Sequence, residues 1–302
     1  MAIAIGLLAS FLFAITNHID KYMLSKIENN TSNIKSLLVF SSLIAGICLS
    51  PIWLCVCKFD VNTSNIAILL AFVSAIIYVL ATYLYFKALE KNDTSLVVAF
   101  FQLIPVFSFI LELIFLNETL QINELVGMVI IIISAIFISL EFEEKKNNNK
   151  FIALILMTFS SLFFSLYFFV FDISMRIGNY NKTTFWYQIG LLLVGLVLIS
   201  IKGYRSSFKE MIIKNKKKII SLNILNETIN LLGNIFANLA NVLIPLAIVN
   251  ALNGFQSAFA FVIGVIGVIF APKLFKEDLG RKNVMQKLIC IILGIFGLII
   301  MV

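Results

Sequence analysis

The chain has 302 residues, of which 61% are hydrophobic and only 13% are charged. Soluble domains have about 45–50% apolar and about 25% charged residues, so this composition excludes an ordinary soluble enzyme, a nucleic-acid-binding module and a disordered chain. The net charge of +7 then indicates basic loops beside anionic lipid headgroups rather than a nucleic-acid partner. We therefore expect a polytopic membrane protein.

Ten apolar segments, separated by short polar breaks, follow one another along the chain. Each is close to the roughly 17–25 residues that a helix needs to cross a bilayer. Because lipid offers no partner to backbone N–H and C=O groups, each segment is predicted to be helical and the fold to be all-α. The predicted spans are residues 2–24, 35–57, 65–89, 94–116, 121–140, 151–175, 183–202, 219–241, 243–270 and 283–302.

A polar linker over residues 142–150 separates two halves of five predicted spans, residues 1–141 and 151–302. The halves are weakly similar, since Phe101-Gln102 in the fourth span matches Phe255-Gln256 in the ninth. An odd number of spans in each half forces the two halves into opposite orientations. The pattern predicts two inverted-topology repeats, an architecture on which many secondary transporters are built.

Lys and Arg residues concentrate in the odd-numbered connections, among which Lys287 is counted at the start of the tenth span. The even-numbered connections hold only Lys58, Arg176 and Lys182. The positive-inside rule then places the odd connections in the cytoplasm and both termini outside. The basic loop predicted at residues 202–218 is expected to lie against anionic lipid headgroups, although the positive-inside bias alone would also produce it.

The eighth span carries the longest row of polar residues. Asn and Glu side chains recur every three or four positions from Asn223 to Asn241, which places them on one helical face. An acid at mid-span costs roughly 2.5–3.5 kcal/mol on insertion scales, so Glu227 is predicted to be a substrate or proton site on a cavity wall. The alternative is that the asparagines hydrogen-bond between packed helices.

Other spans contribute further candidates. His18 is the only histidine and titrates near neutral pH, so His18 and Asp20 join Glu227 as candidates for proton coupling; the alternative is that this helix end meets the membrane interface. Pro105 is expected to kink the fourth span and expose backbone carbonyls. The predicted solute-binding residues are Asn17, His18, Tyr78, Tyr85, Gln102, Glu112, Tyr167, Glu227, Asn230, Asn234, Asn250 and Asn253.

Several segments resemble the EamA-type repeat of the drug/metabolite transporter superfamily. Tyr85–Leu89 resembles the box that ends the third helix of that repeat, Pro105 its central proline, and Phe115–Leu120 its Leu-x-Glu-x-Leu hairpin. The second half is less similar, since Ser257 replaces the central proline, although Pro272–Leu279 resembles the corresponding hairpin.

The resemblance implies ten helices in two inverted repeats, with helices 1, 3, 4, 6, 8 and 9 around a central cavity. It implies a carrier that works by alternating access, exposing one site to each side of the membrane in turn. Glu118 and Glu277 would then have structural roles at the two hairpins. The resemblance also implies cytoplasmic termini, in disagreement with the distribution of Lys and Arg.

These observations predict a secondary transporter, in particular an exporter, of a small metabolite or an amphiphile, with proton coupling left open. The amide and tyrosine lining weakly favours an uncharged to zwitterionic solute. The alternative is a flippase for lipids or lipid-linked substrates, or an accessory subunit of one. The sequence holds no HExxH motif, cysteine cluster or GxxxxGK[ST] loop, so we expect no enzyme activity, metal, cofactor or nucleic-acid partner. We expect a monomer or homodimer in the cell (inner or plasma) membrane.

Overall fold

The computed structural model describes residues 2–26, 30–116, 121–139, 149–215, 218–243, 252–272, 275, 277 and 279–301, and the statements below concern these residues. They form helices joined by short irregular segments, without strands, which confirms the predicted all-helical class for this part of the chain. The elements are α1 (Ala2–Lys26), α2 (Asn30–Ile44), η1 (Ala45–Leu49), α3 (Ser50–Val56), α4 (Asn65–Lys91), α5 (Thr94–Ala99), η2 (Phe100–Gln102), α6 (Leu103–Leu116), α7 (Ile122–Ser139), α8 (Asn149–Ile177), α9 (Tyr180–Ser200), α10 (Lys202–Asn215), α11 (Lys218–Leu243), α13 (Gln256–Phe270) and α14 (Arg281–Met301).

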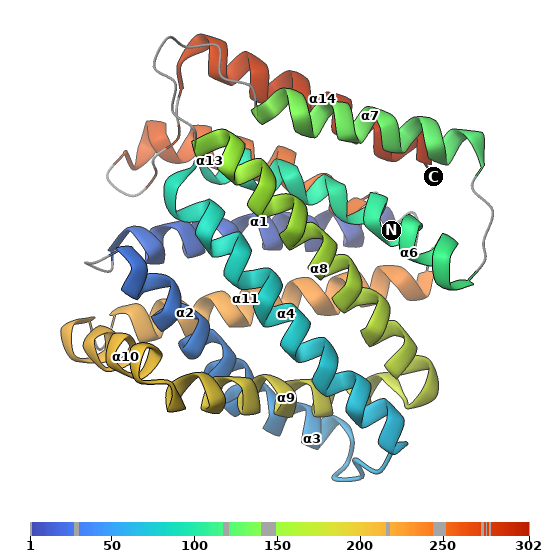
Figure 1. The fold of residues 1–302 in the computed structure, drawn as a ribbon, viewed down its shortest axis with the longest axis vertical. Helices are drawn as coiled ribbons and strands as arrows, with labels where there is room; N and C mark the ends of the chain where they lie inside the picture. The colour runs from blue at the N-terminus through green and yellow to red at the C-terminus, as the bar shows by residue number, and fades with distance from the viewer. Residues whose placement is uncertain are drawn as a thin grey trace. The chain divides into compact units, whose positions relative to one another are not determined.

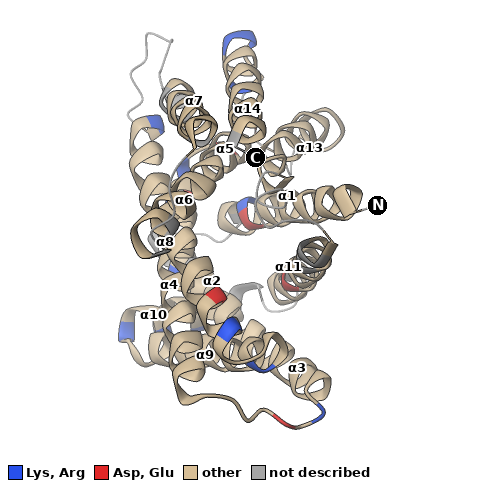
Figure 2. Cartoon of the chain, turned by 90° about the vertical axis from the view of Figure 1, so that its right-hand side faces the viewer, with Lys and Arg blue, Asp and Glu red and all other residues tan. Residues whose placement is uncertain are grey.

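Seven helical stretches in the described part of the chain are long and apolar enough to cross a membrane. Figure 2 shows how few charged residues interrupt the helices. Helices α7, α11 and α13 overlap the three remaining predicted spans but are not among the seven, so the count of ten spans stays a prediction. The seven stretches are Ala2–Ser25, Ile34–Val56, Asn65–Lys91, Thr94–Phe115, Asn149–Ile177, Tyr180–Ser200 and Arg281–Ile300.

Two of these stretches change their helical winding just before a proline. The π-helical turn η1 precedes Pro51, and the 3₁₀ turn η2 precedes Pro105. A proline ring removes one backbone donor and clashes with the preceding turn, and a change of winding accommodates both effects. The kink and the exposed carbonyls expected at Pro105 stay predictions.

The chain forms two compact units, each built from both halves of the sequence. Unit 1 comprises Met1–Tyr22, Lys87–Ser161 and Thr228–Val302, and unit 2 comprises Met23–Phe86 and Leu162–Glu227. The division at residues 142–150 was predicted between sequence repeats, which need not coincide with compact units, and it stays a prediction.

Unit 1 is held together by small residues where its helices meet. Ala14 of α1, Val98 of α5 and Ala260 of α13 form one buried apolar cluster. Elsewhere in this unit α7 and α14 run side by side (Figure 1). Two hydrogen bonds connect them: the Ser134 hydroxyl donates to the carbonyl of Cys290, and the Gln286 amide donates to the carbonyl of Phe137, each at 2.7 Å.

In unit 2, the loop predicted at residues 202–218 is not observed. Residues 202–215 form helix α10 rather than a loop, and residues 216–217 lie outside the described part of the chain. The reason is a helical spacing of apolar residues, since Tyr204, Phe208 and Met211 share one face. The Phe208 ring lies 6.1 Å from that of Phe40 in α2, and Met211 is 3% exposed.

Candidate functional site

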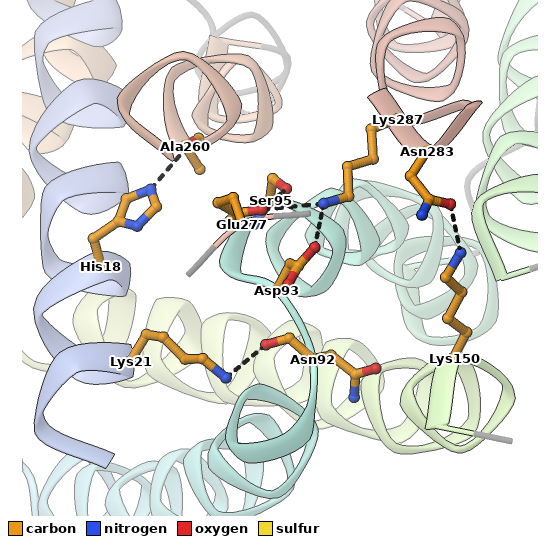
Figure 3. A network of polar contacts seen from close by, with 10 residues as sticks. All are labelled: His18, Lys21, Asn92, Asp93, Ser95, Lys150, Ala260, Glu277, Asn283 and Lys287. Atoms are coloured by element: carbon orange, nitrogen blue, oxygen red, sulfur yellow. Dashed lines mark hydrogen bonds and ion pairs between the residues drawn. The ribbon is translucent and has the colours of Figure 1, made fainter. Parts of the chain in front are cut away.

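Two acidic side chains in unit 1, the buried Glu277 and the half-buried Asp93, contact Lys287 of α14 (Figure 3). Its Nζ atom donates to Asp93 Oδ2 at 2.5 Å and to Glu277 Oε2 at 3.1 Å. The side chains of Lys287 and Glu277 are each only 4% exposed. Taking an ion out of water costs several kcal/mol, which the pairing of opposite charges offsets. The group joins α14 to the α4–α5 connection and to the segment before α14.

Glu277 also accepts hydrogen bonds from the beginning of α5. Its Oε1 atom accepts a hydrogen bond from the backbone N–H of Ser95 at 3.1 Å, and its Oε2 atom accepts one from the Ser95 hydroxyl at 2.6 Å. The first N–H groups of a helix have no partner within the helix, so a carboxylate there is stabilised. This placement supports the structural role predicted for Glu277, which stays a prediction.

Lys21 of α1 donates hydrogen bonds to backbone carbonyls at and just after the end of α4. Its Nζ atom donates to the carbonyls of Leu89, Glu90 and Asn92 at 2.6, 3.1 and 2.8 Å. The last carbonyls of a helix carry partial negative charge, which an ammonium group stabilises. Lys21 therefore anchors α1 to the end of α4.

His18 lies one turn before Lys21 and is buried, with 8% of its surface exposed. Its Nε2 atom is 2.8 Å from the carbonyl oxygen of Ala260, and its ring centroid is 5.3 Å from that of Phe275. Since a carbonyl only accepts hydrogen bonds, Nε2 carries a proton in this contact. Asn17 and Asp20 are also buried, at 5% and 8% exposure. The proton-coupling roles of His18 and Asp20 stay predictions.

Gln102 lies in the interior of unit 1, at the irregular turn of the fourth span. Its Nε2 atom donates to the Ser257 hydroxyl at 2.9 Å, and that hydroxyl donates to the carbonyl of Gly254 at 2.9 Å. Helix α14 approaches the amide so closely that a Cβ atom added at Gly294 would lie 1.7 Å from Gln102 Oε1. The site needs the absence of a side chain at position 294.

Two serine hydroxyls in unit 1 bind backbone carbonyls at the irregular parts of the helices. Ser10 of α1 donates to the carbonyl of Leu252 at 2.8 Å, beside the turn before α13. Ser161 of α8 donates to the carbonyl of Phe100, in η2, at 3.1 Å. The first helix of each sequence half thus supports the interrupted helix of the other half.

Unit 2 contains a cluster of three tyrosines, Tyr78 of α4, Tyr167 of α8 and Tyr187 of α9. Their ring centroids are 5.3 Å apart for Tyr78–Tyr167, 6.2 Å for Tyr78–Tyr187 and 5.6 Å for Tyr167–Tyr187. The side chains of Tyr167 and Tyr187 are hydrogen-bonded to each other, and Glu227 of α11 interacts electrostatically with Tyr187. The structure therefore brings two predicted site residues, Tyr78 and Tyr167, into one tyrosine cluster.

The asparagines on the polar face of α11 differ in burial and in their hydrogen-bond partners. Asn223 is fully buried, and its amide donates to the hydroxyl of Ser41 at 3.1 Å, as the packing alternative requires. Asn234 is exposed, and its amide donates to the carbonyl of Asn230 at 2.9 Å within the same helix. The side chains of Asn238 and Asn241 lie outside the described part.

The remaining predicted residues are separate from these groups or are not described. Tyr85 is buried, with its ring centroid 5.4 Å from that of Phe86, and Asn253 is half-buried. The side chain of Glu112 and all of Glu118 and Asn250 lie outside the described residues. Within the part of the chain that is described, no group of three or more His, Cys, Asp or Glu residues is placed to hold a metal ion.

Asp93, Tyr187 and Lys287 are among the residues of these groups that were not predicted as site residues. Lys287 was counted with a connection, whereas it lies about two turns inside α14. A lysine at that depth needs a counter-charge, and this signal was available in the sequence. The sequence did not show which residues pair with Lys287, because Asp93 and Lys287 are 194 positions apart.

Outside the spans, an exposed ion pair holds the connection between α3 and α4. The Nζ atom of Lys182 donates to Asp60 Oδ2 at 2.8 Å and to the carbonyl of Asn62 at 2.9 Å. The hydrogen bond from Lys182, together with one from the backbone N–H of Asn62, lowers the pKa of the Asp60 carboxyl below its usual value. The pair connects this segment to the beginning of α9.

Comparison with known families finds a match for the first half of the chain. Residues 1–140 match the model of the EamA-like transporter family, which confirms the predicted family for this half. No curated protein matches the sequence. A solved structure titled "Crystal structure of protein" shares the fold, with a TM-score of 0.56 and 12% identity over 98% of this chain and 94% of the other. Over residues 1–140 the chain is therefore similar to the EamA-like transporter family, which belongs to the drug/metabolite transporter superfamily.

Proposed function

We propose that the protein is a secondary transporter that exports a small metabolite or an amphiphile by alternating access. The observation that carries this proposal is the match of residues 1–140 to the EamA-like transporter family. The buried polar groups support it, because polar side chains on membrane-spanning helices are costly and commonly mark the paths of solutes or ions. We place the solute contact at Tyr78, Tyr167 and Glu227 of unit 2.

The proposal includes ten spanning helices in two inverted repeats, residues 1–141 and 151–302. The hydrogen bonds of Ser10 and Ser161 support this arrangement. Each lies on the first helix of one half and binds a carbonyl in the interrupted fourth helix of the other half. Such reciprocal contacts are what two related halves would make.

Glu227 is the first candidate for coupling the solute to protons, with His18 and Asp20 as further candidates. Replacing Glu227 with glutamine keeps the size of the side chain and removes its charge. We expect the transport rate in proteoliposomes to fall by about tenfold or more and its dependence on pH to disappear, since one charge–dipole contact in a low-dielectric site contributes about 1.5–3 kcal/mol.

Asp172→Asn is the matched control, since it makes the same change in an ion pair with Arg176 near the end of α8. Exposed pairs of this kind contribute little, so this variant should transport like the wild type. Unchanged transport and pH dependence in Glu227→Gln would remove Glu227 from the mechanism.

A second candidate function is the movement of lipids or lipid-linked substrates, and helix α10 favours it. Its exposed residues Lys202, Arg205 and Lys209 share a face with Ile213, which is 78% exposed. Cations beside a large apolar side chain suit a surface of anionic headgroups. A scrambling assay with fluorescent phospholipids in proteoliposomes separates the functions: rapid scrambling supports a flippase, and its absence supports the carrier.

The lipid contact of α10 has its own test. Replacing Lys202, Arg205 and Lys209 with glutamine should weaken retention of anionic lipid, because each cation near such a surface contributes about 1 kcal/mol. Native mass spectrometry with phosphatidylglycerol and phosphatidylcholine measures this effect. Equal retention of both lipids by the wild type would contradict the proposed contact.

We place the protein in the cell (inner or plasma) membrane with both termini outside, as the distribution of Lys and Arg indicates. A C-terminal fusion to a reporter that is active only in the cytoplasm should then be inactive. An active reporter would support the opposite orientation, which the family resemblance implies.

A further inference from the structure

We propose that Glu277 and Asp93 exchange places as the cap of helix α5, and that this exchange releases α5 from Glu277. The inference rests on the proposed transport function, because alternating access requires contacts at helix ends to break and re-form. It goes beyond that function by naming the contact that breaks and the group that replaces it. Helix α5 begins the stretch Thr94–Phe115, which is long and apolar enough to cross a membrane.

The residue just before α5 is an aspartate, yet the helix is capped by another side chain (Figure 3). An aspartate at this position usually accepts a hydrogen bond from the N–H group of the second or third helical residue. The backbone of Asp93 is extended, with φ −64° and ψ 147°, but its side chain makes no capping hydrogen bond. The N–H group of Ser95, the second helical residue, donates to Glu277 instead. Two carboxylates can therefore cap α5, and Glu277 does so in this structure.

Lys287 contacts both carboxylates, and this double contact permits the exchange. Its Nζ atom lies 2.5 Å from Asp93 Oδ2 and 3.1 Å from Glu277 Oε2, and its side chain is only 4% exposed. A buried ammonium group that loses its only partner is strongly destabilising, but Lys287 keeps Asp93 when Glu277 leaves. Since a carboxylate has two accepting oxygens, Asp93 can hold Lys287 with Oδ2 and accept from the Ser95 N–H with Oδ1.

The surface of α13 beneath Glu277 has no side chain that would hold it mechanically. A Cβ atom added at Gly264 would lie 2.8 Å from Cγ and 3.2 Å from Oε1 of Glu277, and one added at Gly267 would overlap the ring of Phe275. Glu277 is therefore held by hydrogen bonds and the ion pair rather than by interlocking side chains. Because its side chain is 4% exposed, it also regains solvation on leaving.

The reactivity of a cysteine at position 95 measures the release of Glu277. Ser95 is fully buried and its hydroxyl lies 2.6 Å from Glu277 Oε2, so we expect Ser95→Cys to react with a methanethiosulfonate reagent only when Glu277 moves away. The four native cysteines are replaced with alanine, and the protein is studied in nanodiscs. Ser161→Cys in α8 is the matched control for general opening, since Ser161 is also fully buried.

The exchange predicts effects of opposite sign for the two acids. Glu277→Gln removes the charge that binds Lys287, so labelling at position 95 should become at least about tenfold faster. Asp93→Ala removes the alternative cap and leaves Lys287 with Glu277 alone, so labelling should become about fivefold slower. Neither change should alter labelling at position 161. Asp93→Asn, which is similar in shape to the native residue, should also slow labelling, because Lys287 then depends on Glu277.

Faster labelling at position 95 in both Asp93 variants would overturn the proposal. In that case the two acids only hold the same group together, and loss of either one loosens it. Faster labelling at position 161 in the same variants would assign the effect to general loss of structure and equally contradict the exchange.

A reversible disulfide tests whether the release is part of transport. Since Cβ of Glu277 is one bond from Cγ, a Gly264→Cys, Glu277→Cys pair lies close to the roughly 3.5–4.5 Å that two Cβ atoms need for a disulfide. Oxidation should stop the loss of metabolites from overproducing cells, and dithiothreitol should restore it. Ile131→Cys with Gly297→Cys is the matched control, because it connects α7 to α14 at a similar distance and should not stop export.

The labelling experiment needs no solute, so its failure is distinct from failure of the transport function. If the wild type exports no compound, the proposed function is wrong, whereas the two acids can still be compared by labelling. If the wild type exports a compound and the oxidised Gly264→Cys, Glu277→Cys protein exports it equally fast, transport stands and the proposed release is wrong.

Discussion

Replacing Lys287 with methionine should lower the free energy of unfolding by about 3–5 kcal/mol, because it leaves two carboxylates without their shared ammonium group. The side chain of Glu277 is 4% exposed, so water solvates little of its charge. Denaturation of the purified protein with increasing detergent, followed by circular dichroism, measures the loss. Lys287→Arg keeps the charge and should retain more stability than the methionine variant.

Lys282→Met is the matched control, since Lys282 lies on the same helix and is exposed. It should change stability by less than about 0.5 kcal/mol. Neutralising the whole group, with Asp93→Asn and Glu277→Gln added to Lys287→Met, should recover part of the loss, because no unpaired charge then remains buried. A Lys287→Met protein as stable as the wild type would show that the ion pairs do not hold this part of unit 1.

Gly294→Ala should destabilise the protein by about 1–3 kcal/mol, although alanine is the better helix former. The added Cβ atom would lie 1.7 Å from Oε1 and 2.4 Å from Cδ of Gln102. The hydrogen bond to Ser257 holds Gln102 in place, so the helices must separate to make room. The same denaturation measurement detects this change.

A double-mutant cycle identifies the cause. In a Gln102→Ala background the side chain that clashes is gone, so Gly294→Ala should then cost little. Gly203→Ala in α10 is the control, because the nearest atom to its added Cβ is Lys35 Nζ at 3.7 Å. An undiminished penalty in the Gln102→Ala background would mean that position 294 rejects a side chain for another reason.

The helices were predictable because lipid imposes a single rule on them. A stretch of about 20 apolar residues must satisfy its backbone within itself, so hydropathy alone located most of the described helices with small errors at their ends. The ninth span is the exception, since it was predicted from residue 243 and helix α13 begins at Gln256. Helix α10 is too basic for a membrane span, so hydropathy does not reveal it, although Tyr204, Phe208 and Met211 form an apolar face at helical spacing. A search for helical periodicity in the connections would have found it.

The partners of buried polar side chains were not predictable. Periodicity placed the asparagines of α11 on one face, but it could not show that Asn223 binds Ser41, which is 182 positions away. Nor could periodicity show that Lys287 pairs with Asp93. Periodicity shows which residues share a face, whereas the identity of the opposing face depends on how distant helices pack.

The central claim is that the protein carries a solute out of the cell. Its most direct test is an untargeted comparison of metabolites, inside cells and in their medium, between cells that lack the protein and cells that overproduce it. The proposal predicts that at least one compound falls inside the overproducing cells and rises in their medium, with the reverse change in cells that lack the protein. Identical metabolite levels inside and outside both kinds of cell would contradict it.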